Sequence, residues 1–160
     1  MRVIDKDVTA VVIESADRQI VLGHKDPDSN GPYAGFSVLP GGAIETRGSV
    51  YEAARGEVFR ETGIDLDDEF RVRPVDENQQ DVSEVVLTSG EIVEYRMSFF
   101  RFHATTSKLA EEVMIAPPYE LEEGDELAEV KWVRIEDLGQ YNHCPPSLTL
   151  FSKLGYLAVV

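Results

Sequence analysis

Residues 41 to 64 decide the fold of this chain, and they read Gly-Gly-Ala-Ile-Glu-Thr-Arg-Gly-Ser-Val-Tyr-Glu-Ala-Ala-Arg-Gly-Glu-Val-Phe-Arg-Glu-Thr-Gly-Ile. The pair Gly41-Gly42 lets the backbone turn tightly and approach a ligand closely. Ser49 can cap the N-terminus of a helix, and Gly63 is the glycine expected just beyond its C-terminus. The stretch therefore predicts a glycine loop that leads into a helix over residues 50 to 62.

Two carboxylates share one face of this predicted helix. Because an α-helix has 3.6 residues per turn, Glu57 and Glu61 lie about 40° apart around its axis. Two carboxylates at this spacing can share an oxygen-loving cation such as Mg²⁺ or Mn²⁺. Arg60 lies on the same face, where it removes one possible ligand and adds a positive charge beside the expected cation. The alternative is a solvated acidic face on which Arg60 pairs with Glu57, an interaction that stabilises by only ~0.2–0.5 kcal/mol.

The same stretch resembles the Nudix box, G-x5-E-x7-R-E-U-x-E-E-x-G-U, in which U is an aliphatic residue. Six residues match the box without a gap: Gly42, Glu57, Val58, Glu61, Gly63 and Ile64. Three positions depart from it, because Gly48 and Arg60 stand where the box has Glu and Gly56 stands where it has Arg. Arg55 is no substitute for the missing arginine, since a shift of one residue rotates a side chain by about 100° around the helix.

The order of elements along the chain predicts one α+β domain. Strands are expected at residues 8–14, 19–24, 36–39, 82–87, 92–104 and 129–135, and a terminal helix at 146–154. The first two strands are expected to form a hairpin, as are the fourth and fifth, whereas residues 65–78 are expected to be polar and partly irregular. The resemblance to the Nudix family implies a mixed β-sheet sandwiched between α-helices, in a single domain over residues 1–160.

The resemblance also implies a metal site. In that family the two surviving box glutamates correspond to metal ligands, and the carbonyl of the first loop glycine assists, which gives Glu57, Glu61 and Gly41 here. A bound Mg²⁺ or Mn²⁺ lowers the pKa of a bound water and neutralises the leaving phosphate. A further carboxylate often comes from a nearby or later loop, and the candidates are Glu45, Glu120, Glu122, Glu123, Asp125 and Glu126. Each of these can equally be solvated surface.

Three cations are candidates for contact with the substrate. His24 and Lys25 end a predicted strand that in this family borders the substrate pocket, and Arg60 can reach a phosphate. Arg47 and Arg55 are weaker candidates. Three aromatic residues could stack on a base or belong to the core: Tyr33, Phe36 and Tyr95.

Two functions remain open at this point. The first is a metal-dependent Nudix-type pyrophosphohydrolase, in which Glu57 and Glu61 act in catalysis on a diphosphate linkage in a nucleoside diphosphate derivative. The second is a non-catalytic Nudix-fold module that binds a nucleotide-like ligand or a protein partner. The three departures within the box favour the module, whereas the retained glutamates and loop glycines favour the hydrolase.

Composition restricts the partners. The 160 residues include 15 basic and 30 acidic side chains, for a net charge of −15. We therefore expect no binding to polymeric nucleic acid or to an anionic membrane. No run approaches the ~18 apolar residues that a membrane-spanning helix needs. The expected partner is a small-molecule nucleoside diphosphate derivative, and a homodimer stays open.

Cysteine usage points to the cytoplasm. Cys144 is the single cysteine, so no internal disulfide can form, as is usual in a reducing compartment. Its neighbour His143 invites a thiol–imidazole interpretation. We reject it, because adjacent residues in an extended chain point to opposite faces and Pro145-Pro146 keeps this segment extended.

Overall fold

The computed structural model describes residues 1–29, 32–44, 48–87, 89–117 and 127–158. Its main elements are β1 (Arg2–Glu14), β2 (Gln19–Lys25), β3 (Ser37–Val38), β4 (Gly41–Ala43), α1 (Val50–Thr62), β5 (Phe70–Val86), β6 (Ile92–Thr106), β7 (Leu127–Arg134) and α2 (Pro145–Lys153). Two short 3-10 helices, η1 (Ala110–Glu112) and η2 (Ile135–Gln140), complete them. No helix in these ranges is long and apolar enough to cross a membrane.

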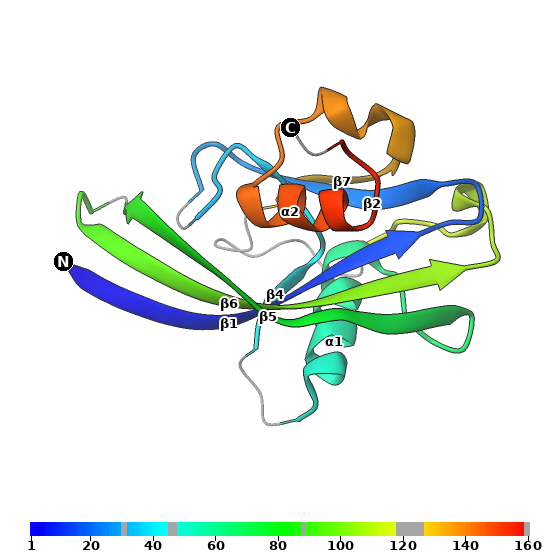
Figure 1. Cartoon of the computed structure of the whole chain (residues 1–160), viewed down its shortest axis with the longest axis horizontal. Coiled ribbons are helices and arrows are strands. Elements are labelled where there is room, and N and C mark those ends of the chain that lie inside the picture. The colour runs from blue at the N-terminus through cyan, green and yellow to red at the C-terminus, as the bar shows by residue number, and fades with distance from the viewer. Residues whose placement is uncertain (30–31, 45–47, 88, 118–126, 159–160) are drawn as a thin grey trace.

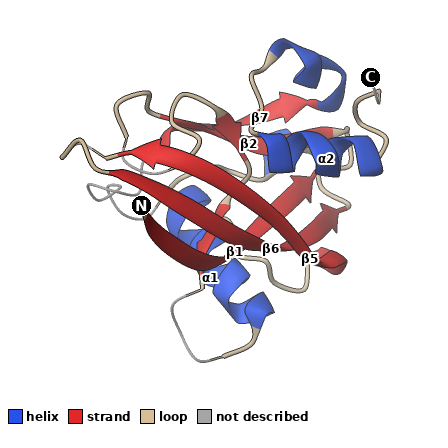
Figure 2. Ribbon diagram, turned by 60° about the vertical axis from the view of Figure 1, so that its left-hand side comes forward, coloured by secondary structure: helices blue, strands red, loops and turns tan. Residues whose placement is uncertain are grey.

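The seven strands form one mixed sheet. Its main path has the order β3-β2-β1-β6-β5, with β4 paired to β1 and β7 paired to β2. Strand β1 runs parallel to β6 along its whole length, from Arg2 beside Val93 to Glu14 beside Thr105, whereas the other pairings are antiparallel. Figure 2 shows β1, β6 and β5 curving together as three long neighbouring strands.

Both faces of the sheet are covered where β1 crosses the centre, as Figure 1 shows with α1 and α2 on opposite sides. Val11 and Ile13 pack with residues of α1 on one face. Ala10 and Val12 pack with residues of α2 on the other. Successive side chains of a strand point to opposite faces, so a run that is apolar at every position needs a cover on both sides. The predicted α+β class, with a mixed sheet between helices, is confirmed.

The predicted elements mostly agree with the structure. Strands β5 and β6 form the expected second hairpin, while β1 and β2 are antiparallel neighbours that meet at Glu14 and Ile20. The irregular segment expected up to residue 78 is wrong from Phe70 onward, where β5 begins. Among the described strands, β5 pairs with β6 alone, so it lies at an edge of the sheet. The side chains of Arg71 and Arg73 on this strand are exposed to solvent. An edge strand can therefore carry a polar sequence while its backbone pairs on one side.

Candidate functional site

The candidate site begins with helix α1, whose ends are set by its own sequence. The Ser49 hydroxyl accepts the Glu52 N–H at 3.0 Å, and Gly63 follows the last turn with a φ of 75°. The helix spans the predicted residues 50 to 62. Ala54 and Val58 are fully buried against the sheet, which turns the opposite side of α1 toward solvent.

The glycine pair lies directly against α1. Gly41 has a φ of 152°, and a Cβ there would come within 2.0 Å of the Thr9 carbonyl oxygen on β1. A Cβ on Gly42 would lie 2.7 Å from Glu57 Oε2. The missing side chains therefore let strand β4 fit between β1 and the glutamates of the helix.

The two glutamates have different surroundings. Glu61 is only 5% exposed, and its Oε1 accepts the Gly41 N–H at 2.7 Å. The Glu57 side chain is 24% exposed, and its Oε2 accepts a hydrogen bond from Arg60 Nη2 at 2.5 Å. This is the Glu57–Arg60 pair that the sequence offered as the alternative to a metal site. Glu61 is thus held by a neutral backbone donor, whereas Glu57 is held by a cation.

These groups partly fit a divalent metal. The structure brings Glu57, Glu61 and the backbone of Gly41 together, and oxygen atoms are the ligands that Mg²⁺ and Mn²⁺ prefer. Gly41 contacts Glu61 through its N–H, and Arg60 occupies one oxygen of Glu57. Within the described ranges, no group of three or more His, Cys, Asp or Glu side chains is placed to hold a metal ion.

The supporting carboxylates proposed from sequence cannot be placed, because Glu45, Glu120, Glu122, Glu123, Asp125 and Glu126 lie outside the described residues, as does Arg47. The described residues on either side of residues 118–126 are held by backbone contacts. The Ala116 N–H donates to the Thr62 carbonyl at the end of α1 at 2.9 Å, and Leu127 pairs with Lys25 of β2.

Two of the other candidate cations have identified hydrogen-bond partners. His24 and Lys25 end β2, where Lys25 Nζ donates to the Pro32 carbonyl at 3.0 Å and ties the β2–β3 connection to the strand. Arg55 makes a two-pronged contact with Asp65 at 2.6 and 3.0 Å. Arg55 therefore does not replace the missing box arginine, as expected from the helical rotation.

The candidate aromatic residues are partly buried and pack against the core. Tyr33 and Tyr95 pack against the core cluster on the α2 side, and Phe36 packs against the smaller cluster that contains Val38. Tyr33 has a φ of 68°, and its hydroxyl donates to the Asp81 carboxylate. Burial and the Asp81 contact raise the pKa of Tyr33. Asp81 lies 48 residues from Tyr33 in the sequence, so no local pattern indicated this contact.

The adjacent His143 and Cys144 form no thiol–imidazole pair. The nearest partner of His143 Nε2 is the Leu138 carbonyl at 2.6 Å, and the nearest partner of Cys144 Sγ is the Ser147 hydroxyl at 3.2 Å. Burial lowers the pKa of His143 and raises the pKa of Cys144. Both shifts favour the neutral forms, so rejecting the thiol–imidazole interpretation was correct.

One polar cluster escaped the sequence analysis. Glu14 Oε1 contacts His103 Nε2 at 2.9 Å and accepts a hydrogen bond from the Tyr156 hydroxyl. The hydrogen bond from His103 and then that from Tyr156 lower the pKa of Glu14, against the opposing effect of burial. The partners lie 89 and 142 residues from Glu14 in the sequence, so no local pattern could have revealed the cluster.

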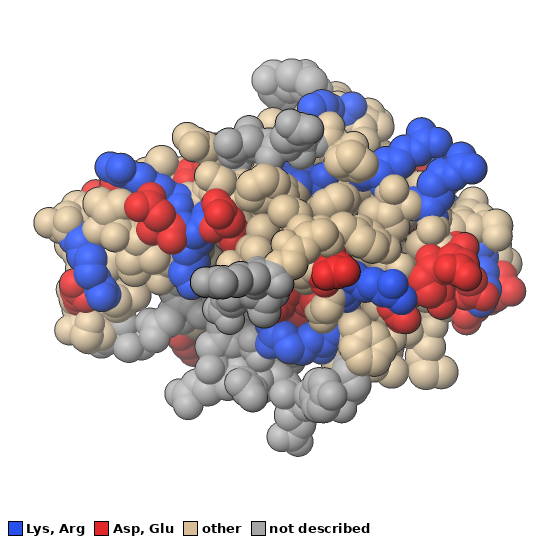
Figure 3. Space-filling view, turned by 90° about the horizontal axis from the view of Figure 1, so that it is seen from below, with Lys and Arg blue, Asp and Glu red and all other residues tan. Residues whose placement is uncertain are grey.

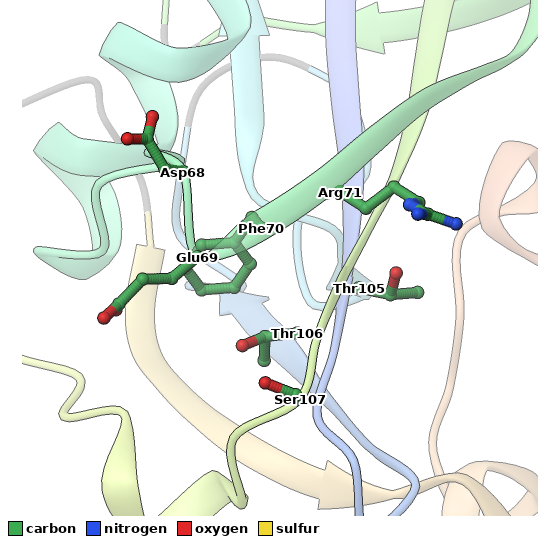
Figure 4. A pocket seen from close by; sticks show the side chains of 7 residues that line it. All are labelled: Asp68, Glu69, Phe70, Arg71, Thr105, Thr106 and Ser107. Atoms are coloured by element: carbon green, nitrogen blue, oxygen red, sulfur yellow. The ribbon is translucent and has the colours of Figure 1, made fainter.

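The surface around α1 carries charges of both signs. Figure 3 views the molecule from the α1 side and shows basic side chains beside acidic ones, although the whole chain has a net charge of −15. A shallow pocket lies elsewhere, where β5 begins and β6 ends. It is lined by Asp68, Glu69, Phe70, Arg71, Thr105, Thr106 and Ser107 (Figure 4). None of the site residues predicted from sequence lines this pocket.

The family follows from a comparison of sequences. A sequence model described as the NUDIX domain matches residues 5–154. The chain belongs to the Nudix family. No curated protein is similar enough to match.

Solved structures show the same fold at low sequence identity. A Nudix hydrolase from M. smegmatis, RenU, shares 17% identity with a TM-score of 0.61, over 97% of this chain and 89% of that one. The NUDIX domain of Shewanella oneidensis NrtR, crystallised with ADP-ribose, shares 16% identity with a TM-score of 0.65, over 95% and 87%. The C. elegans Ap4A hydrolase shares 15% identity with a TM-score of 0.58, over 95% and 97%.

Proposed function

We propose that this Nudix-family protein is a metal-dependent pyrophosphohydrolase that cleaves a diphosphate linkage in a nucleoside diphosphate derivative. The observation that supports it best is the meeting of Glu57, Glu61 and Gly41 where β4 lies against α1. Glu57 and Glu61 stand at box positions that correspond to metal ligands in the family, and Gly41 is the loop glycine whose carbonyl assists there. Membership of the family supports the reaction type.

Glu57 and Glu61 would hold Mg²⁺ or Mn²⁺, with the Gly41 carbonyl as a further ligand. Such an ion neutralises a leaving phosphate and lowers the pKa of a bound water. The Gly41 N–H orients Glu61, so one carboxylate is preorganised by the backbone. Because Gly42 has no side chain, it leaves room for the carboxylate of Glu57, which a Cβ at this position would approach to 2.7 Å.

The general base would come from a carboxylate of residues 118–126, which lie outside the described part of the chain. The contact between Ala116 and Thr62 supports this assignment, because it fixes the chain beside the end of α1 just before that segment. Arg60, His24 and Lys25 would supply positive charge to the phosphates. A protein of net charge −15 needs such local cations to attract an anionic substrate.

A second function is favoured by the contact between Arg60 and Glu57. If that ion pair excludes the metal, the chain is a non-catalytic module that binds a nucleotide-like ligand or a protein partner. The replacement of two further box residues by Gly48 and Gly56 favours the same outcome. We also propose that the protein is cytoplasmic and that it binds neither polymeric nucleic acid nor membranes. That it forms a homodimer stays a prediction.

A Mn²⁺ titration combined with a hydrolysis panel separates the two functions. We expect Glu57→Gln with Glu61→Gln to abolish Mn²⁺ binding and hydrolysis of every active substrate among ADP-ribose, Ap4A and nucleoside triphosphates. The control is Glu52→Gln, which removes an exposed charge from the same helix and should leave both unchanged.

The metal site lies elsewhere if the double variant binds Mn²⁺ as the parent does. If the parent binds nucleotides but hydrolyses none of the panel, the non-catalytic module is the better description.

A further inference from the structure

The start of β5 is an open edge of the sheet. Residues 70–74 pair with β6 in regular antiparallel register, from Phe70 beside Thr106 to Pro74 beside Phe102, and the register shifts after Pro74. Among the described residues, no other strand pairs with β5, and outside this ladder residues 71–74 make no backbone hydrogen bond. An edge strand of this kind presents a row of unpaired backbone groups to a further strand.

Two arginines follow each other on one face of this edge. Arg71 and Arg73 lie opposite Thr105 and His103 of β6, and the ring of His103 contacts Tyr156, which follows α2. Arg73 therefore lies on the α2 side of the sheet, and Arg71 lies there too, because alternate residues of a strand share a face. Figure 4 shows Arg71 and Thr105 pointing to the same side.

These two guanidinium groups lack a counter-ion. Both side chains are exposed, and neither makes a hydrogen bond or an ion pair with another described residue. The chain nevertheless carries 30 acidic residues against 15 basic ones. Charges farther away than about 8 Å are largely screened at physiological ionic strength, so the local charge of this edge is positive.

The other face of the same edge is apolar. Phe70 and Val72 are partly buried and pack against the core cluster that contains Val58 of α1. A strand added beside β5 would thus have cations along one face and apolar side chains along the other. Because every strand repeats its side chains with the same period of two residues, a segment in which carboxylates alternate with apolar residues would match both faces.

The charges also oppose pairing of this edge with a second copy of itself. Charged side chains and proline are common protection at exposed edges, and both are present at residues 71–74. Antiparallel pairing of two such stretches about Val72 would place Arg71 of one copy opposite Arg73 of the other. The same charges would attract a strand that carries carboxylates, so the edge discriminates between the two partners.

We propose that residues 70–74 form a docking edge for an extended acidic segment of a partner protein, in which carboxylates alternate with apolar residues. The backbone of the segment extends the sheet beyond β5, and its carboxylates contact Arg71 and Arg73. Exposed ion pairs are individually weak and are screened by salt, so the interaction is transient and depends on ionic strength. It involves neither the glutamates of α1 nor a metal and is therefore independent of the proposed hydrolysis.

The test uses a fluorescein-labelled heptapeptide in which Glu and Val alternate, with fluorescence anisotropy as the measure of binding and EDTA present to remove divalent metal. Two control peptides replace its Glu residues with Lys or group them at one end. The variant protein carries Arg71→Glu with Arg73→Glu. The matched control carries Arg2→Glu with Arg134→Glu, which changes the net charge equally at two exposed arginines on β1 and β7.

We expect the parent to bind the alternating peptide with a dissociation constant below about 1 mM. Both control peptides should bind at least about fivefold more weakly. The double change at Arg71 and Arg73 should weaken binding at least about tenfold, because repulsion replaces two attractions. The control variant should stay within about twofold of the parent, since screening limits the effect of distant charges.

Nuclear magnetic resonance tests the strand geometry directly. When the peptide is bound, the amide signals of residues 71–73 should shift, and the amides that point outward from the sheet should exchange with water more slowly. The reason is that the backbone of the added strand covers them and accepts their hydrogen bonds.

The proposal is wrong if the parent does not bind the alternating peptide, a result that needs no variant. It is also wrong if the Lys peptide binds as tightly, or if the control variant loses as much affinity as the change at Arg71 and Arg73. Pyrophosphate tests a phosphate site as the simpler alternative. If pyrophosphate binding depends on the same two arginines while the peptide leaves the amides of residues 71–73 unchanged, the surface binds small anions and docks no strand.

Discussion

Replacing Gly56 with Ala should stabilise this protein. Gly56 lies inside α1, where a glycine is less favourable than alanine by about 0.5–1 kcal/mol, since it loses more backbone freedom on folding. A Cβ at this position would meet no atom within 4 Å, so the new methyl group should cause no strain. For a chain of this size the expected gain corresponds to an increase in melting temperature of about 1–4 °C.

The glycine at the end of the same helix provides the control. Gly63 has a φ of 75°, and a Cβ there would come within 2.0 Å of the Ala116 carbonyl oxygen. Gly63→Ala should therefore destabilise the protein by at least about 1–2 kcal/mol, from the left-handed backbone alone. Two identical substitutions seven residues apart should shift stability in opposite directions.

Urea unfolding followed by circular dichroism measures both changes in the free energy of unfolding. The denaturant midpoint should rise for Gly56→Ala and fall for Gly63→Ala, with little change in the slope of either transition. A lower midpoint for Gly56→Ala would refute the reasoning. It would show that something other than helix propensity and the space around the residue favours glycine at this position.

Two further outcomes concern the partly buried Glu14 and the buried Cys144. Glu14→Gln should lower the free energy of unfolding at pH 7 by on the order of 1 kcal/mol. Because the hydrogen bonds from His103 and Tyr156 lower the pKa of Glu14 in the folded protein, its contribution is complete above the unfolded value of 4.5 and is lost as the pH falls through the folded value. Urea titrations across this range should show the difference between parent and variant shrinking below pH 4.5, and a difference that stays constant there would contradict the assignment. Cys144 is 4% exposed and burial raises its pKa, so it should react with a thiol reagent far more slowly in the folded protein than in urea. Equal rates in the two states would show that the thiol is accessible.

The local signals around α1 were sufficient to predict that helix from the sequence. Ser49 and Gly63 act on backbone groups within one turn, so the ends of the helix could be placed at the correct residues. The spacing of Glu57, Arg60 and Glu61 likewise fixed which side chains share a face, and it offered the ion pair between the first two as one of two alternatives. These contacts join residues three or four positions apart, so they can be inferred from the order of the residues alone.

Only the tertiary structure could decide the contacts between distant segments. The burial of Glu61 depends on the Gly41 N–H, which strand β4 brings to the helix by pairing with β1. The start of β5 at Phe70 depends on pairing with β6, because its polar sequence gives no strong local preference for a strand. The cluster around Glu14 joins residues from opposite ends of the chain. Such contacts form because the folded sheet makes distant residues neighbours, so no local pattern of the sequence contains them.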